Sequence, residues 1–153
     1  RGAQALQNLL AAAKAEGLSP IICSAYRSVE KQQQLYENQI AQQVSLGYDR
    51  TAAEERAGTI VAYPGTSEHN LGLAVDIVSL PNPMLDESQE ETPEAKWLAE
   101  HCSEYGFILR YPKDKTEITG IIYEPWHFRY VGVDVAKEIM AQGVCLEEFL
   151  DMA

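Results

Sequence analysis

Basic residues are scarce in this sequence. It contains 12 lysines and arginines against 23 aspartates and glutamates, which gives a formal net charge of −11 at pH 7. Nucleic-acid binding requires basic patches that neutralise phosphates, so this composition argues against a nucleic-acid partner. The same excess of negative charge argues against contact of this domain with an anionic membrane surface.

Long apolar runs are also missing. No stretch approaches the ~20 apolar residues that a helix needs to cross a bilayer, and none has the pattern of a signal peptide. The chain starts at Arg1 and not at a methionine. We therefore interpret it as a processed or truncated piece.

Cysteine is rare as well, with three residues, Cys23, Cys102 and Cys145. None is paired in a C-x-x-C spacing, which argues against a zinc site built from cysteines. Their neighbours are apolar or helical, so we expect buried free thiols. One disulfide with one remaining thiol is the alternative.

The length of 153 residues and the hydrophobic content of 46% suit one domain with a packed core. The patterns predict helices over 3–15, 28–46, 49–60, 93–105, 133–143 and 145–152, and strands over 21–26, 73–78, 107–111 and, with an interruption, 121–132. Strands and helices do not alternate regularly. The sequence therefore predicts a small α+β domain with a mostly antiparallel sheet flanked by helices.

Asp76 lies in the middle of the apolar strand "LAVDIV". A buried carboxylate must be paired, hydrogen-bonded or bound to a metal, and for an isolated aspartate a salt bridge is the ordinary explanation. Asp76 is not isolated, because His69 precedes it by seven residues in a loop that contains Gly65 and Gly72. These glycines permit a tight backbone that returns His69 toward the strand.

A second polar interruption occurs in "YEPWHFRY", which carries Glu124 and His127. Two of the three histidines thus lie within polar breaks of apolar segments, and we expect the third, His101, at the surface of a helix. Positions i and i+3 of a regular strand point to opposite faces. Glu124 and His127 can therefore converge only if the chain turns at Pro125–Trp126.

Two histidines and one aspartate form the ligand set of a catalytic zinc site, in which a fourth position stays open. Hydrolysis also needs a group that takes a proton from water, and Glu124 is the candidate. Arg27 follows a predicted strand and is either an ordinary salt-bridging arginine or a group that stabilises an oxyanion. Ser67 is a candidate donor to a substrate carboxylate.

Three blocks of the sequence resemble a known family. "SAYRSVEKQ", "PGTSEHNLGLAVDI" and "EPWHFRYVG" look like the signature blocks of the zinc D-alanyl-D-alanine carboxypeptidases of the VanY type, over roughly residues 20 to 135. The resemblance implies a DD-peptidase-like α+β fold, one Zn²⁺ per chain held by His69, Asp76 and His127, and Glu124 as the catalytic base and acid.

The resemblance also implies roles around the metal. Arg27 would polarise the scissile carbonyl and stabilise the oxyanion, and Ser67 would hold the terminal carboxylate of the substrate. Gln32 would line the substrate cleft. Tyr26 and Trp126 would be its walls, and core packing explains both equally well.

We expect residues 1–153 to form one catalytic domain that removes the terminal D-alanine from peptidoglycan stem peptides. An L,D-carboxypeptidase that acts on tetrapeptide stems is the main alternative, and a non-catalytic zinc-containing binding domain is a third. The family acts on the cell wall. The domain is therefore expected outside the cytoplasmic membrane, secreted or anchored through an N-terminal segment that this sequence lacks.

Overall fold

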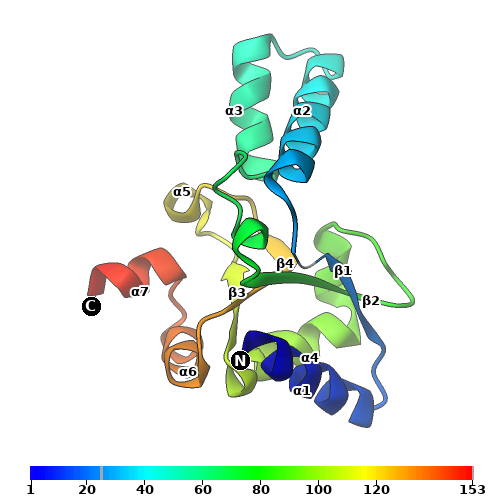
Figure 1. Ribbon diagram of the computed structural model, residues 1–153, viewed down its shortest axis with the longest axis vertical. Coiled ribbons are helices and arrows are strands. Elements are labelled where there is room, and N and C mark those ends of the chain that lie inside the picture. The colour runs from blue at the N-terminus through cyan, green and yellow to red at the C-terminus, as the bar shows by residue number, and fades with distance from the viewer. Residues whose placement is uncertain (25, 153) are drawn as a thin grey trace.

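The computed structural model describes residues 1–24 and 26–152. In this part of the chain four strands form one antiparallel sheet with the spatial order β1-β2-β4-β3. The strands are β1 (Pro20–Ser24), β2 (Ala74–Ser79), β3 (Phe107–Tyr111) and β4 (Glu124–Tyr130). Helices surround this sheet (Figure 1), which confirms the predicted α+β class.

The α-helices of the described residues are α1 (Gly2–Ala15), α2 (Val29–Ser45), α3 (Arg50–Ile60), α4 (Pro93–His101), α5 (Thr116–Thr119), α6 (Val133–Gln142) and α7 (Leu146–Met152). The short 3-10 helices are η1 (Glu68–Leu71), η2 (Glu87–Glu91) and η3 (Cys102–Tyr105). Ser28, Asp49 and Thr92 cap α2, α3 and α4, because each side chain accepts the backbone N–H three residues later.

One face of the sheet is covered by α1 and α4, which lie together below the strands (Figure 1). The core on this side consists of Leu9, Val75, Ile77, Leu98, Cys102, Phe107 and Phe128. Side chains alternate between the two faces of a strand. Because Val75 and Ile77 face the helices, Asp76 between them points to the opposite face.

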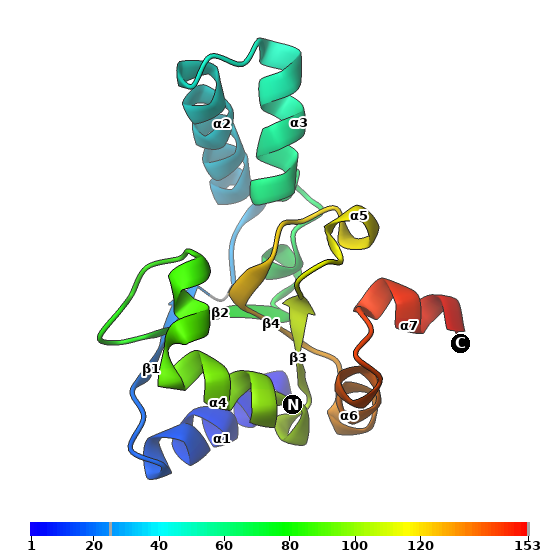
Figure 2. The same cartoon turned by 180° about the vertical axis from the view of Figure 1, so that it is seen from behind.

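The hairpin of α2 and α3 projects from the other end of the molecule (Figure 2). Its two helices pack against each other through their own small core, made of Tyr36, Ile40, Ala53 and Ala57. At the β3 edge, α6 and α7 pack around Ile108 in a third cluster. The face of the sheet that carries Asp76 therefore lies between the hairpin and the helices at the C-terminal end.

β4 differs from the expected strand, interruption and second strand over 121–132. Residues 121–123 are not in a strand, and β4 is continuous from Glu124 to Tyr130. The interruption is instead a register irregularity, because Leu109 and Tyr111 of β3 pair with Phe128 and Glu124. Two steps along β3 thus match four along β4, which is the signature of a bulge.

The cysteines match the prediction only in part. Cys102 and Cys145 are buried free thiols, whereas Cys23 is exposed, and no disulfide links them in the described part of the chain. Cys23 lies on the edge strand β1, where the register with β2 shifts between Ile22 and Ser24.

Among the described helices, none combines the length and the apolar character that crossing a membrane requires.

Candidate metal centre

Three predicted ligands meet on the free face of the sheet. Asp76 and His127 are direct partners in the ladder between β2 and β4, and His69 lies on η1 just before β2. Nε2 of His69 and Nδ1 of His127 each lie 3.2 Å from Oδ1 of Asp76. One ligand atom from each residue falls within 4.8 Å of the others, so the structure brings all three together.

The local backbone explains how His69 reaches this position. Ser67 caps η1 by accepting the N–H of His69, and Gly72 ends η1 with a φ of 69°. That left-handed conformation is inexpensive for glycine. It lets the chain pass within a few residues from η1 into β2, as the glycine-rich sequence predicted.

The donor set fits a divalent metal such as zinc. Two imidazole nitrogens and one carboxylate oxygen are buried together, and three protein ligands leave a position open. Burial raises the pKa of Asp76, but hydrogen bonds from His127 and His69 outweigh this and bring it to about 2. Burial lowers the pKa of His127, whereas hydrogen bonds to Asp76 and Glu68 raise it to about 9. Without a metal, hydrogen bonds from the two histidines thus stabilise the negative charge of Asp76.

Glu124 lies beside this group, in a cavity of about 260 Å³ that the three ligands also line. Glu124 and His127 line the same cavity although they are three positions apart in the sequence, and the register irregularity between β3 and β4 lies between them. Glu124 is 7% exposed, and its Oε2 has no hydrogen-bond partner among the described residues. Burial raises the pKa of Glu124 to about 8, while the charge of His127 opposes the rise.

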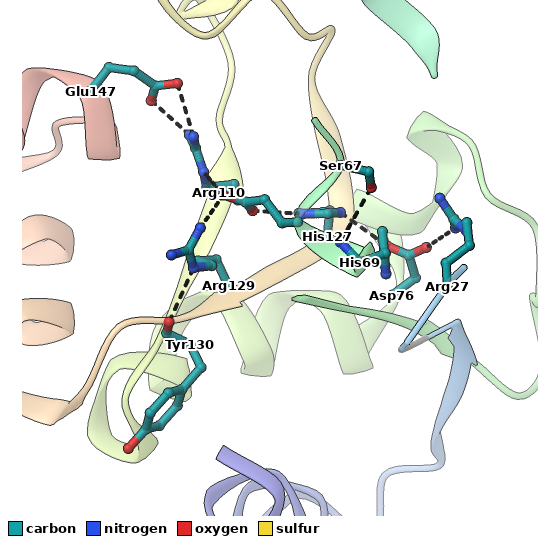
Figure 3. A network of polar contacts seen from close by, with 10 residues as sticks. Arg27, Ser67, His69, Asp76, Arg110, His127, Arg129, Tyr130 and Glu147 are labelled. Carbon is teal, nitrogen blue, oxygen red and sulfur yellow. Dashed lines mark hydrogen bonds and ion pairs between the residues drawn. The ribbon is translucent and has the colours of Figure 1, made fainter. Parts of the chain in front are cut away.

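Arg27 approaches the site from the other side, with Nη2 3.7 Å from Oδ2 of Asp76 (Figure 3). Its Nη2 also donates to Ser24, and its Nη1 donates to Oε1 of Gln32 at 2.8 Å. The backbone N–H of Arg27 donates to the carbonyl of His69. The guanidinium is therefore held at the edge of the cavity with N–H donors to spare.

The remaining predicted residues divide into two groups. Ser67, Gln32 and Trp126 line the same cavity as the ligands. Gln32 is 1% exposed, and its amide is engaged with Arg27 and with the carbonyl of Ala62, which favours holding Arg27 over contacting a substrate. Tyr26 is 71% exposed and lines a separate cavity with Tyr130, so the structure does not bring it to the metal centre.

Three polar residues of the site escaped the sequence analysis. Oε1 of Glu68 lies 3.2 Å from Nε2 of His127, and its Oε2 accepts from Nε of Arg110 at 2.8 Å. Burial raises the pKa of Glu68, but His127 and Arg110 bring it down to about 2. The ring of Tyr111 lies 4.8 Å from that of His127. Arg110 interrupts the apolar strand "FILRY" as Asp76 interrupts "LAVDIV", and this interruption is the signal that could have revealed it.

A sequence model of the VanY family, described as D-alanyl-D-alanine carboxypeptidase, matches residues 1–133. The chain belongs to this family. A D-alanyl-D-alanine carboxypeptidase of Enterococcus faecalis is 49% identical over 147 residues, which cover 95% of this chain and 53% of that protein. The chain thus spans about half the length of this relative.

Solved VanY structures share the fold. VanYB in complex with D-alanine-D-alanine superposes with a TM-score of 0.89 at 48% identity, over 97% of this chain and 80% of that one. A glutamate-to-alanine mutant of a vancomycin resistance D,D-pentapeptidase VanY in complex with Zn(II) gives 0.86 at 47% identity, with the same coverage. The LD-carboxypeptidase LdcB gives 0.85 at 43% identity, over 98% of this chain and 66% of that one.

Proposed function

We propose that residues 1–153 act as one catalytic domain, a zinc-dependent carboxypeptidase that removes the terminal D-alanine from peptidoglycan stem peptides. The observation that carries the proposal is Glu124, a buried carboxyl with an unpaired oxygen in the cavity lined by His69, Asp76 and His127. A site that only stored a metal would not need such a group. Membership of the VanY family and the D-alanine-D-alanine in the VanYB structure support the substrate class.

Zinc is the metal that we assign to the three ligands. Its support is the donor set of two imidazoles and one carboxylate and the Zn(II) in a VanY structure that is 47% identical to this chain. Bound zinc lowers the pKa of its water to about 7 and polarises a carbonyl oxygen. In the metal-free site the pKa of Glu124 is raised. A cation bound nearby would lower it and so help the carboxyl to ionise.

The side chains around the ligands supply the proton transfers and the orientation. Glu124 takes a proton from water as the new C–O bond forms. It then gives the proton to the amine nitrogen as the peptide C–N bond breaks. Arg27 faces the scissile carbonyl and stabilises the negative charge that develops on its oxygen.

Ser67 and the cavity account for recognition of a chain end. The Ser67 hydroxyl accepts the N–H of His69, which leaves its own proton for the terminal carboxylate of a peptide. Trp126 forms part of the wall. A cavity of about 260 Å³ accommodates the last residues of a peptide and excludes a folded polypeptide.

Product analysis by mass spectrometry tests the proposal. The zinc-loaded chain is incubated with a pentapeptide stem that ends in D-alanyl-D-alanine, and separately with a tetrapeptide stem. We expect loss of one D-alanine from the pentapeptide, and none with Glu124→Ala. If a zinc-loaded chain released no D-alanine from either stem, the non-catalytic binding domain would replace this proposal.

An L,D-carboxypeptidase is the second candidate, because the LdcB structure matches this chain almost as well as the VanY structures do. Release of D-alanine only from the tetrapeptide would establish it. Both activities act on peptidoglycan, which lies outside the cytoplasmic membrane. We therefore propose that the chain acts in the cell envelope.

A further inference from the structure

The second ring nitrogen of His127 begins a row of charged side chains that ends on the C-terminal helix. Nε2 of His127 lies 3.2 Å from Oε1 of Glu68, and Oε2 of Glu68 accepts from Nε of Arg110 at 2.8 Å. The other two nitrogens of Arg110 donate to both carboxylate oxygens of Glu147, at 2.7 and 3.0 Å. Figure 3 shows Glu147 and Arg110 on the far side of His127 from Asp76.

The element that supplies Glu147 is α7, which lies outside the residues that the family model matches, 1–133. It is nevertheless packed firmly against the domain. Leu146 is buried in one cluster with Ile108, Ala136 and Ile139, and Ile108 precedes Arg110 by two residues on β3. Glu147 is therefore held in place next to Arg110, and its bidentate pair restricts how the guanidinium turns.

Two arginines and two glutamates meet along this row, so their formal charges cancel. Arg110 and Arg129 both donate to Oε2 of Glu68, and Glu147 supplies the second negative charge that two arginines require. Without Glu147, one positive charge would remain uncompensated beside a centre built for a divalent cation. Such a charge disfavours cation binding, and Arg110 would lose the partner that fixes its direction toward Glu68.

We propose that Glu147 is a positioning residue of the metal centre: it clamps Arg110, which fixes Glu68, which accepts the Nε2–H of His127 and keeps Nδ1 free for the metal. Partners of this kind behind a ligating histidine set its tautomer and its orientation. The inference rests on the proposed function in one respect, namely that His69, Asp76 and His127 hold a metal. It adds a helix beyond the family match to the machinery of that site.

Zinc affinity, measured by competition with a chelator at fixed pH, tests this directly. We expect Glu68→Gln to weaken zinc binding about 10- to 100-fold and Glu147→Gln to weaken it several-fold. Glu148→Gln is the matched control, because Glu148 is the next residue of α7 and pairs with Lys115 at 2.8 Å. It should bind zinc like the wild type. Equal zinc affinities for Glu147→Gln and Glu148→Gln would overturn the inference.

A double-mutant cycle shows whether Glu147 acts through Glu68. If it does, Glu147→Gln should cost little further zinc affinity in a Glu68→Gln background, whereas independent sites would add their effects. Full additivity would contradict the proposed row. Thermal unfolding of the metal-free variants shows whether each one is folded, so a loss of zinc affinity is not mistaken for a loss of structure.

The NMR signal of the His127 ring distinguishes the two roles of Glu147. If the pair between Glu147 and Arg110 only stabilised the fold, its loss would not change this signal. In ¹⁵N NMR of the zinc-loaded chain we expect a protected Nε2–H signal for His127. This signal should shift in Glu147→Gln and stay in place in Glu148→Gln. A wild type that binds no zinc would overturn the proposed function and this inference together. A wild type that binds zinc with a His127 signal insensitive to Glu147→Gln would overturn the inference alone.

Discussion

At the scale of single residues, Glu124 is the group on which activity should depend most. It is buried, one of its oxygens is unpaired among the described residues, and it lines the cavity of the proposed metal ligands. We expect Glu124→Gln to lower kcat by about 10²- to 10⁴-fold, the usual contribution of a general base. The bound zinc should remain, because Glu124 is not a ligand. Steady-state kinetics and metal analysis of the same sample measure both effects.

Glu94 offers a matched control for this variant. It is also a buried glutamate with an unpaired oxygen in the described structure, but its other oxygen accepts the backbone N–H of Ser19, away from the cavity. Glu94→Gln should turn over substrate normally. A Glu124→Gln variant with a rate near that of Glu94→Gln would assign the base to another residue.

The same carboxyl predicts a pH dependence of stability in the metal-free chain. Burial raises the pKa of Glu124 from 4.5 to about 8, so between these values the folded state holds a proton that the unfolded state releases. The free energy of unfolding therefore falls as the pH rises through this window. Glu124→Gln does not titrate, so it should become more stable than the wild type by up to roughly 5 kcal/mol above pH 8.

Denaturant titrations at several pH values, after removal of metal, measure this difference. Well below pH 4.5 the two proteins should approach equal stability, because Glu124 is then protonated in both the folded and the unfolded state. Added zinc should reduce the difference in stability between the two proteins at high pH, since a nearby cation favours the carboxylate form of Glu124. A gap that did not change with pH would mean that Glu124 titrates normally.

Sequence patterns reveal the residues of the site that break an apolar run, and Asp76 and His127 were found in this way. Glu68 has no such signal, because an acidic residue in a polar loop looks like an ordinary surface residue. It is buried, with Arg110 and Arg129 converging on its carboxylate from two strands distant in sequence. Tyr26 is the opposite case, since its neighbours in the sequence line the cavity of the predicted ligands whereas Tyr26 lines another one.

At the scale of elements, Gln32 connects the α2–α3 hairpin to the site. Its Oε1 accepts from Arg27, and its Nε2 donates to the carbonyl of Ala62, which follows α3. We expect Gln32→Ala to destabilise the fold by about 1–3 kcal/mol, because buried partners lose their hydrogen bonds. It should also lower kcat by up to about 100-fold, because Arg27 loses its orientation. Thermal unfolding and steady-state kinetics measure the two effects.

Two further variants separate these roles of Gln32. Gln33→Ala removes an exposed glutamine of the same helix, whose side chain donates to Glu37 one turn along, and should change neither property. Gln32→Glu keeps an acceptor for Arg27 but loses the donor to Ala62, so it should retain more activity than Gln32→Ala. If Gln32→Ala were fully active, Arg27 would not depend on this contact.

Some element boundaries follow from local sequence signals, whereas others depend on how the strands pair. Caps such as Ser28 and Thr92 are local signals, and α2 and α4 begin directly after them as predicted. The end of the second helix was not predicted, because α4 stops at His101 and Cys102–Tyr105 is a 3-10 helix. The bulge in β4 is different, since its existence depends on how β3 pairs with β4. Pro125 indicated an irregularity there, but only the sheet determines that it is a bulge and not a break in the strand.

At the scale of the whole molecule, the metal should act as a cross-link of the fold. His69, Asp76 and His127 belong to η1, β2 and β4, so one ion would join segments that are far apart in the chain. A ligand that binds only the folded state adds about 4 kcal/mol of stability at a free concentration a thousandfold above its dissociation constant. For a domain of this size, that corresponds to a rise in Tm of roughly 10 °C.

Thermal unfolding with excess zinc and after chelation measures this cross-link. The zinc-dependent rise in Tm should vanish in His69→Ala, which lacks one ligand. It should persist in His101→Ala, because His101 pairs with Glu104 on the surface of the α4–η3 segment. It should also be smaller at lower pH, since protons on the ligand imidazoles compete with the metal. A wild-type Tm that is the same with zinc and after chelation would show that the three segments are not joined by a metal.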